Sequence, residues 1–260
     1  MALTEPEPSH VAMRWVWAAL FVYPPTVALG YILRLSLVDA FILAALVALL
    51  PLLAVAQVPL AKASLAEAAP LDRCSVYFGS TITILLLGGV TLAAGLGEPG
   101  AAALGLGMLP FPVLLAWSCG LLVAAVAALL LFHELGRALG IPGSPFLAAL
   151  LPVTVRERRL FMFLSLAAGL GEEVAFRGYV FAQLVSLGLG PWGAAIASAA
   201  PFGVLHAYQG WWGSLRTGLL GFAFATSVVL SGSLWPAVIA HAGIDVVAGL
   251  WLGRWLLARS

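Results

Sequence analysis

The sequence predicts an all-α, polytopic membrane protein with about eight transmembrane helices. Hydrophobic residues make up 63% of the 260 residues and charged residues only 9%, and the mean hydropathy is +1.08. Soluble domains carry roughly 25% charged residues. The apolar residues also fall into runs of the length that a membrane helix needs, which is about 20 residues. A soluble fold is therefore excluded.

Short polar or glycine-rich segments separate the apolar runs. The eight predicted spans cover residues 13–33, 37–60, 75–96, 109–132, 159–187, 191–208, 212–231 and 235–257. Residues 1–12 are polar and contain Pro6 and Pro8, and we predict a disordered tail there. Residues 13–149 then form N-terminal transmembrane helices and residues 150–257 the C-terminal helices of one integrated membrane domain.

The distribution of basic residues supports this number of spans. With eight spans, both termini and the loops after the second, fourth and sixth spans lie on one side of the membrane. The basic residues on that side are Arg14, Lys62, Arg73, Arg137, Arg156, Arg158, Arg159, Arg216, Arg254 and Arg259. Arg34 alone lies on the other side, and Arg177 lies within a span. Because cytoplasmic loops collect Lys and Arg, both termini are predicted to be cytoplasmic.

Charge and cysteine content exclude other classes of function. The formal net charge is +1, and the only dense basic segment is residues 156–159, so no nucleic-acid partner is predicted. Cys74 and Cys119 have neither metal-binding nor disulfide spacing. Asp39 is a lone acid near the start of the second span, where we interpret it as an interfacial residue.

Three charged residues interrupt the long apolar run over residues 160–187. Glu173 and Arg177 are four positions apart with the acid first, so they can pair on one face of a helix. Glu172 is rotated by about 100° from Glu173 and can point elsewhere. Ionisable residues at membrane depth are costly and are functional candidates by default. The alternative is an ion pair that only holds helices together.

Two histidines and an aspartate lie in later spans. His206 lies in the sixth span, while His241 and Asp245 share one face of the eighth because they are four residues apart. At 1.5 Å per residue, Glu172 and Asp245 lie about 18 Å, and His241 about 24 Å, from the cytoplasmic end of their helices. Spans five, six and eight are therefore predicted to build an intramembrane catalytic cavity.

These residue types can activate water. A glutamate can accept the proton of a water, and histidine donors can stabilise a developing oxyanion. Two histidines and a carboxylate are also a common zinc set, so one divalent metal such as zinc, held by Glu172, His206 and His241, is an open alternative. Either route predicts hydrolysis, with an amide bond as the leading substrate.

The three motifs, taken in order, resemble those of the type II CAAX prenyl endopeptidases and their bacterial relatives, the CPBP intramembrane proteases, which include lysostaphin-resistance-like proteins. That family shows Glu-Glu-x-x-x-Arg, Phe-x-x-x-His and His-x-x-x-Asn/Asp on successive helices. Here the motifs read Glu172-Glu173-x-x-x-Arg177, Phe202-x-x-x-His206 and His241-x-x-x-Asp245. The resemblance covers about residues 150–248 and leaves the N-terminal half as generic membrane helices.

The resemblance implies an endopeptidase, in a bacterial plasma membrane, that cleaves a membrane-anchored protein or peptide. Glu172 would then be the base that activates water, and His206 would help to hold that water. His241 and the last motif residue would bind the oxyanion or a metal. Glu173 and Arg177 would orient the site or the substrate carboxylate, although a structural ion pair fits them equally well.

The last motif ends in Asp245, whereas some other members of the family have an asparagine at this position. Asparagine can donate a hydrogen bond to an oxyanion, whereas an ionised aspartate cannot. Asp245 must therefore be protonated, ligate a metal, or accept the second N–H of His241. We favour the last role, in which Asp245 orients His241.

Two functions of other classes compete with the protease. A non-catalytic immunity or regulatory protein could use the same fold, but the retained glutamate, histidines and aspartate weigh against it. A proton or ion transporter could use the buried carboxylates. The sequence has no inverted repeat and no charged relay along its other spans, which argues against transport.

Overall fold

The structure, a computed structural model, describes residues 7–66 and 71–257, and every regular element among them is helical. The elements of the first half are α1 (Pro8–Ile32), α2 (Leu37–Ala44), η1 (Ala45–Leu49), α3 (Leu50–Ala66), α4 (Arg73–Gly97), α5 (Phe111–Ala138) and α6 (Pro145–Ala149). Those of the second half are α7 (Val155–Glu173), η2 (Val174–Val180), α8 (Phe181–Ser186), α9 (Gly190–Leu205), η3 (Ala207–Gln209), α10 (Gly210–Ser231), α11 (Trp235–Val247), η4 (Ala248–Leu252) and α12 (Gly253–Leu257).

Each of the eight predicted spans corresponds to a helical rod, and three rods contain a π-helical turn (η1, η2 or η4). Several boundaries differ from the prediction; the second rod, for example, continues to Ala66 and the fifth begins at Val155. The first helix begins at Pro8, so residues 8–12 are helical where a disordered tail was predicted, and residues 1–6 lie outside the described part. Proline is well suited to the first turn of a helix. The fourth rod continues to Ala138, six residues past its predicted end.

Six of these rods are long and apolar enough to cross a membrane, which makes the protein a polytopic membrane protein. They are residues 8–32, 37–65, 73–97, 111–138, 207–231 and 235–256. The rod α7–η2–α8 differs because Glu172, Glu173 and Arg177 interrupt its apolar sequence. The other exception, α9, is 16 residues long, about 24 Å at 1.5 Å per residue.

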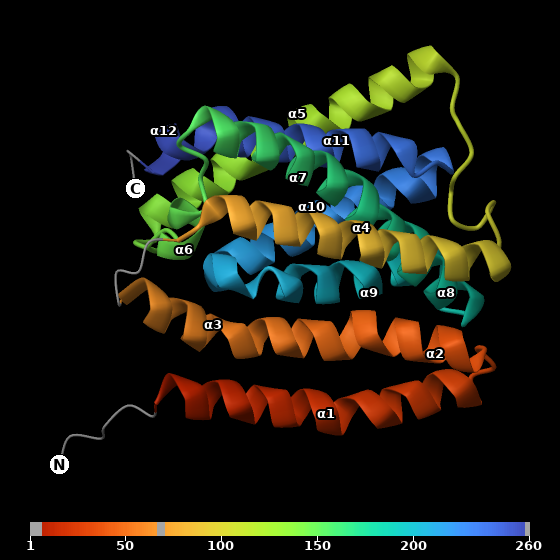
Figure 1. The fold of residues 1–260 in the computed structure, drawn as a ribbon. Coiled ribbons are helices and arrows are strands. Elements are labelled where there is room, and N and C mark those ends of the chain that lie inside the picture. Colours follow the sequence, from red (N-terminus) through yellow and green to blue (C-terminus); the bar gives the residue numbers. More distant parts are fainter. Residues whose placement is uncertain (1–6, 67–70, 258–260) are drawn as a thin grey trace.

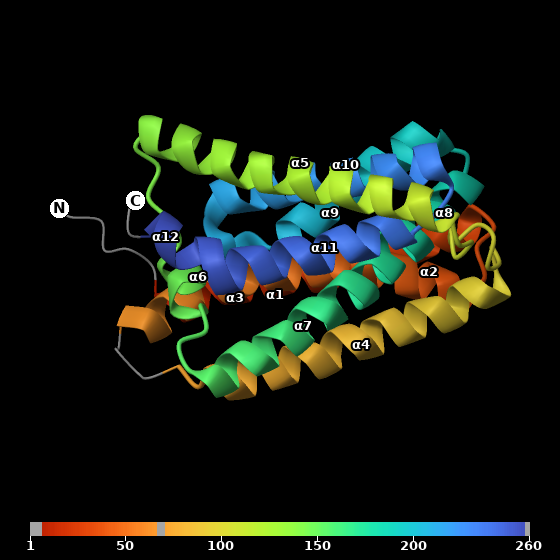
Figure 2. The ribbon, with the colours of Figure 1, turned by 90° about the horizontal axis from the view of Figure 1, so that it is seen from above.

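The rods run side by side and form successive layers (Figure 1). Helix α1 packs on the rod α2–η1–α3, and α3 packs on α9. Helices α9 and α10 pair closely, as do α4 and α7, while α11 lies between α5 and α7 (Figure 2). Helices α4, α9, α10 and α11 therefore pack against the rod that carries the Glu-Glu-x-x-x-Arg motif.

One end of the bundle gathers the start of α1, the end of α3, the starts of α4 and α7, and α12 (Figure 1). The opposite end holds the turn between α1 and α2 and the loop between α4 and α5. Arg73, Arg156 and Arg254 belong to helix ends at the first of these faces. The alternation of the rods therefore agrees with the one-sided distribution of basic residues in the sequence.

The loop between α4 and α5 fixes the start of α11. The backbone oxygen of Gly105 accepts a hydrogen bond from the Leu234 amide at 2.7 Å. The Ser233 hydroxyl donates to the Gly107 oxygen at 2.7 Å, and the Trp235 indole donates to the Leu106 oxygen at 3.0 Å. This loop therefore helps to position the helix that carries His241 and Asp245.

Candidate active site

Helix α7 begins with a capping box that sets where its first turn starts. The Thr154 hydroxyl accepts from the Glu157 amide at 3.2 Å, and the Glu157 carboxylate accepts from the Thr154 amide at 2.7 Å. Such reciprocal bonds satisfy two amides that a helix start would otherwise leave unpaired. The same helix then carries Glu172 and Glu173 as its last two residues.

Glycines allow α7 to lie very close to two neighbouring helices. A Cβ atom at Gly171 would lie 2.5 Å from the Ile84 carbonyl oxygen of α4, and one at Gly169 would lie 2.7 Å from the Val238 oxygen of α11. No larger residue fits at either contact without movement of a backbone. Small residues at such contacts let membrane helices approach closely. The close approach of α11 brings His241 to the end of α7.

Arg177 lies in the π-helical turn η2 and is completely buried. Its Nη1 donates to Glu173 Oε1 at 2.9 Å, and its Nε donates to the Gly221 carbonyl oxygen of α10 at 3.2 Å. The guanidinium carbon lies 3.9 Å from the centre of the Phe202 ring of α9. The predicted pair of Glu173 and Arg177 is present, and it also joins α10 and α9 to η2.

Glu173 also contacts His241. The Oε1 atom that binds Arg177 lies 2.7 Å from His241 Nδ1, and the Glu173 side chain is completely buried. Because an ionised carboxylate can only accept hydrogen bonds, Nδ1 carries the proton in this contact. The neutral histidine ring therefore has its lone pair on Nε2.

Two other carboxylates flank His241 Nε2. Glu172 Oε2 lies at 3.8 Å and Asp245 Oδ2 at 3.7 Å, which are both longer than a hydrogen bond. Glu172 Oε2 is buried and makes no hydrogen bond to any described residue. Asp245 is more open, with 37% of its side chain exposed. The interpretation that Asp245 orients His241 through a hydrogen bond differs from this geometry, in which Glu173 makes that contact.

His206 lies at the C-terminal end of α9. Its Nδ1 donates to the Phe202 carbonyl oxygen at 2.9 Å, because a carbonyl oxygen can only accept. The His206 ring centre is 4.8 Å from that of Phe202, and the Phe202 ring centre is 6.1 Å from that of His241. Phe202 thus lies between the two histidines. Pro201 lies inside α9, which nevertheless continues to Leu205.

The predicted metal set fits this arrangement poorly. Among residues 7–66 and 71–257, no group of three or more His, Cys, Asp or Glu side chains is placed to hold a metal ion. Glu172 and His241 are neighbours, but His206 contacts the cluster through the Phe202 ring. We therefore derive no catalytic step through a metal.

Several residues around the site were not identified from the sequence. The Gly221 carbonyl oxygen binds Arg177, and the Phe224 ring centre lies 5.7 Å from that of His241. Gly221 is one of 28 glycines, and no sequence pattern distinguishes it. Phe224 is likewise one apolar residue among many in its span.

Asp39, which was interpreted as an interfacial residue, has hydrogen-bond partners within the protein. Its side chain is buried, and Oδ1 accepts from the Tyr179 hydroxyl at 2.7 Å. The Ser36 hydroxyl donates to the other carboxylate oxygen. Tyr179 belongs to η2, two residues after Arg177, so Asp39 ties α2 to the turn that carries the arginine.

Comparison with known proteins gives one match. Residues 155–247 match the family model of the Rce1-like type II CAAX prenyl endopeptidases. No curated protein and no solved structure matches the chain. The matched segment begins with the first residue of α7, ends with the last residue of α11, and contains all six predicted site residues. Over this segment the chain is similar to the Rce1-like type II CAAX prenyl endopeptidases, as its three motifs predict.

Proposed function

We propose that this protein is an intramembrane endopeptidase that hydrolyses a peptide bond in a membrane-anchored protein or peptide. The observation that carries the proposal is the environment of Glu172. Its Oε2 is buried without a hydrogen-bond partner among the described residues and lies 3.8 Å from Nε2 of a histidine that Glu173 orients. A carboxylate with a free lone pair beside a fixed histidine is suited to activating a water.

In the proposed reaction, Glu172 accepts a proton from the water while the water oxygen bonds to the scissile carbonyl carbon. The carbonyl electron pair moves onto its oxygen and gives a tetrahedral oxyanion. Collapse of this intermediate breaks the C–N bond, and Glu172 returns its proton to the leaving nitrogen. A general base of this kind contributes about 10²–10⁴ to the rate.

His241 would stabilise the charge that develops in this step, while His206 would act on the attacking water. Glu173 holds the Nδ1–H of His241, which leaves Nε2 directed at the carboxylates of Glu172 and Asp245. When His241 is protonated at both nitrogens, Nε2–H can donate to the oxyanion. We assign His206 to holding the water, with its tautomer set by the Phe202 oxygen.

Glu173 and Arg177 would act as positioning residues. Glu173 is fully buried and has both of its hydrogen-bond contacts through Oε1. Arg177 compensates its charge and is itself held by the Gly221 oxygen and the Phe202 ring. The pair thus fixes His241 without contacting the substrate.

The proposed setting is a bacterial plasma membrane with both termini cytoplasmic and all eight rods crossing the bilayer. The six candidate spans and the arrangement of helix ends support this topology. Glu172 and Glu173 are the last two residues of α7, far from its start at Val155. The scissile peptide bond of the substrate would therefore have to enter the bilayer to reach them.

The test is cleavage by the purified full-length protein in liposomes. The substrates are a prenylated peptide with a C-terminal Cys-aliphatic-aliphatic motif and an unmodified transmembrane peptide. We expect Glu172→Gln to lower the cleavage rate by about 10²–10⁴. Glu134→Gln, at an exposed acid paired with Arg137, is the matched control and should cleave as the wild type does. Full activity of Glu172→Gln would contradict the proposal.

A further inference from the structure

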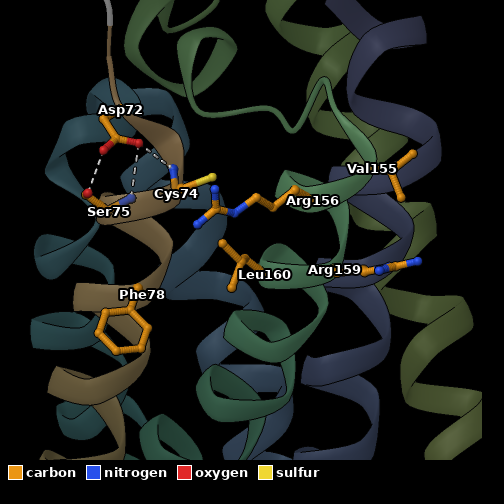
Figure 3. A pocket seen from close by; sticks show the side chains of 8 residues that line it. All are labelled: Asp72, Cys74, Ser75, Phe78, Val155, Arg156, Arg159 and Leu160. Atoms are coloured by element: carbon orange, nitrogen blue, oxygen red, sulfur yellow. Dashed lines mark hydrogen bonds between the residues drawn. The ribbon is translucent and has the colours of Figure 1, made fainter.

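A groove of about 750 Å³ lies between the first turns of α4 and α7 (Figure 3). Glu172 and Glu173 lie at the other end of α7. Phe78 of α4 and Leu160 of α7 supply its apolar walls. Phe78 is 60% exposed although it belongs to a helix that is apolar enough to span a membrane. The apolar part of the groove therefore faces the acyl region of the bilayer.

Arginines border the polar end of this groove. Arg156 points from α7 across the groove toward Cys74 and Asp72 at the start of α4 (Figure 3). Arg159 also borders the groove, although its side chain points away from α4. Both arginines are exposed and belong to the first turns of α7, where the positive end of the helix dipole adds to their charge.

The acids nearby are already engaged by other partners. Asp72 accepts from the Ser75 hydroxyl and from the amides of Cys74 and Ser75, and the Ser75 hydroxyl bond is the main cause that lowers the Asp72 pKa. Glu157 accepts from the amides of Val153 and Thr154. The charge of Arg156 is the smallest of the causes that lower the Asp72 pKa, but no carboxylate of the described residues lies within 4.0 Å of its guanidinium. The guanidinium therefore has no close ion-pair partner that would prevent it from binding an anion.

We infer that this groove binds an anionic phospholipid, with the phosphate at Arg156 and an acyl chain along Phe78 and Leu160. Arginine binds phosphate oxygens in a bidentate manner, and basic residues at the membrane surface attract anionic lipids. A soluble anion would use only the polar end of the groove. A lipid uses both the charge and the exposed apolar wall.

The test is lipid retention by the purified full-length protein, measured by native mass spectrometry. The protein is mixed with equal amounts of phosphatidylglycerol and phosphatidylcholine that carry the same acyl chains. The wild type should retain phosphatidylglycerol preferentially. Arg156→Gln should weaken this retention about fivefold, the factor for one basic residue near a membrane surface. Arg158→Gln, at an exposed arginine that does not line the groove, should retain the lipid as the wild type does.

A second pair of variants tests the apolar wall. Phe78→Ala should weaken phosphatidylglycerol retention, whereas Phe163→Ala, at an exposed phenylalanine of α7 outside the groove, should leave it unchanged. Equal effects of Arg156→Gln and Arg158→Gln would overturn the proposal, because the whole basic surface would then attract the lipid. Inorganic phosphate that displaces the lipid at equimolar concentration would also overturn it, since the acyl chain would then contribute nothing.

Discussion

Glu173 Oε1 lies 2.7 Å from His241 Nδ1, although the two residues are 68 positions apart in the sequence. The same oxygen accepts from Arg177 Nη1 at 2.9 Å. One buried carboxylate atom thus joins the end of α7 and the middle of α11 to the π-helical turn between α7 and α8. The neighbouring Glu172 has no such partner among the described residues, so two adjacent glutamates have different surroundings and different proposed roles.

Glu173→Gln should destabilise the protein, whereas Glu172→Gln should mainly remove activity. Loss of the Glu173 charge leaves the buried Arg177 uncompensated, and breaking a buried ion pair costs about 3–5 kcal/mol. Glu172 Oε2 has no hydrogen-bond partner in the described structure, so its replacement breaks no hydrogen bond and removes only the longer contact with His241. The free energy of unfolding in detergent measures the first effect and peptide cleavage the second. Equal stability of the two variants would contradict the positioning role of Glu173.

Asp245→Asn should retain cleavage activity. Asp245 lies 3.7 Å from His241 Nε2 and makes no hydrogen bond that orients the ring, since Glu173 holds the other nitrogen. An asparagine amide can in addition donate to an oxyanion. The control is His241→Ala, which should lower the rate by about 10²–10³, as expected for loss of an oxyanion donor. A comparable loss in Asp245→Asn would show that the carboxylate itself is required.

Gly221→Ala should impair catalysis from a position outside the motifs. A Cβ atom there would overlap with Arg177 Nη2 and would lie 3.0 Å from Phe202 Cδ1. The guanidinium must move, and displacements of about 1 Å near a catalytic site can cost 10²-fold in rate. Gly218→Ala is the control on the same helix, because its Cβ would meet no atom closer than 3.6 Å. The cleavage rates of the two variants, measured at equal folded fraction, test whether Arg177 positions the site.

Gly88→Ala should loosen the contact between α4 and α7. The added Cβ would lie 2.6 Å from the Gly171 Cα, which is backbone and can yield only if the helices separate. Overpacking of this kind typically costs about 1–3 kcal/mol. A Cβ atom at the adjacent Gly89 would meet no other atom within 4 Å, so Gly89→Ala should be neutral or stabilising.

Thermal unfolding in detergent, followed for both glycine variants beside the wild type, measures this difference. An equal melting temperature for Gly88→Ala and Gly89→Ala would show that the close contact between α4 and α7 contributes nothing to stability. Gly171 directly precedes Glu172, so we also expect Gly88→Ala to lower the cleavage rate.

The sequence by itself determined the membrane class, the positions of the helical rods and the three motifs of the site. These depend on local properties: the length and composition of apolar runs, and the spacing of polar residues along a helix. The rods α7–η2–α8 and α9, which are not among the six apolar candidates, were also predicted from local sequence. The glycines and the proline of residues 188–191 mark a clear break between them. The pair of Glu173 and Arg177 also follows from spacing alone.

Only the tertiary structure decided which partners these residues have. The contacts of Arg177 with Gly221, of Glu173 with His241 and of Tyr179 with Asp39 join residues that are 44, 68 and 140 positions apart. Such contacts depend on the rotation of each helix about its axis and on how closely two helices approach. Both are set by packing at positions such as Gly169 and Gly171, and no local pattern in the sequence encodes them.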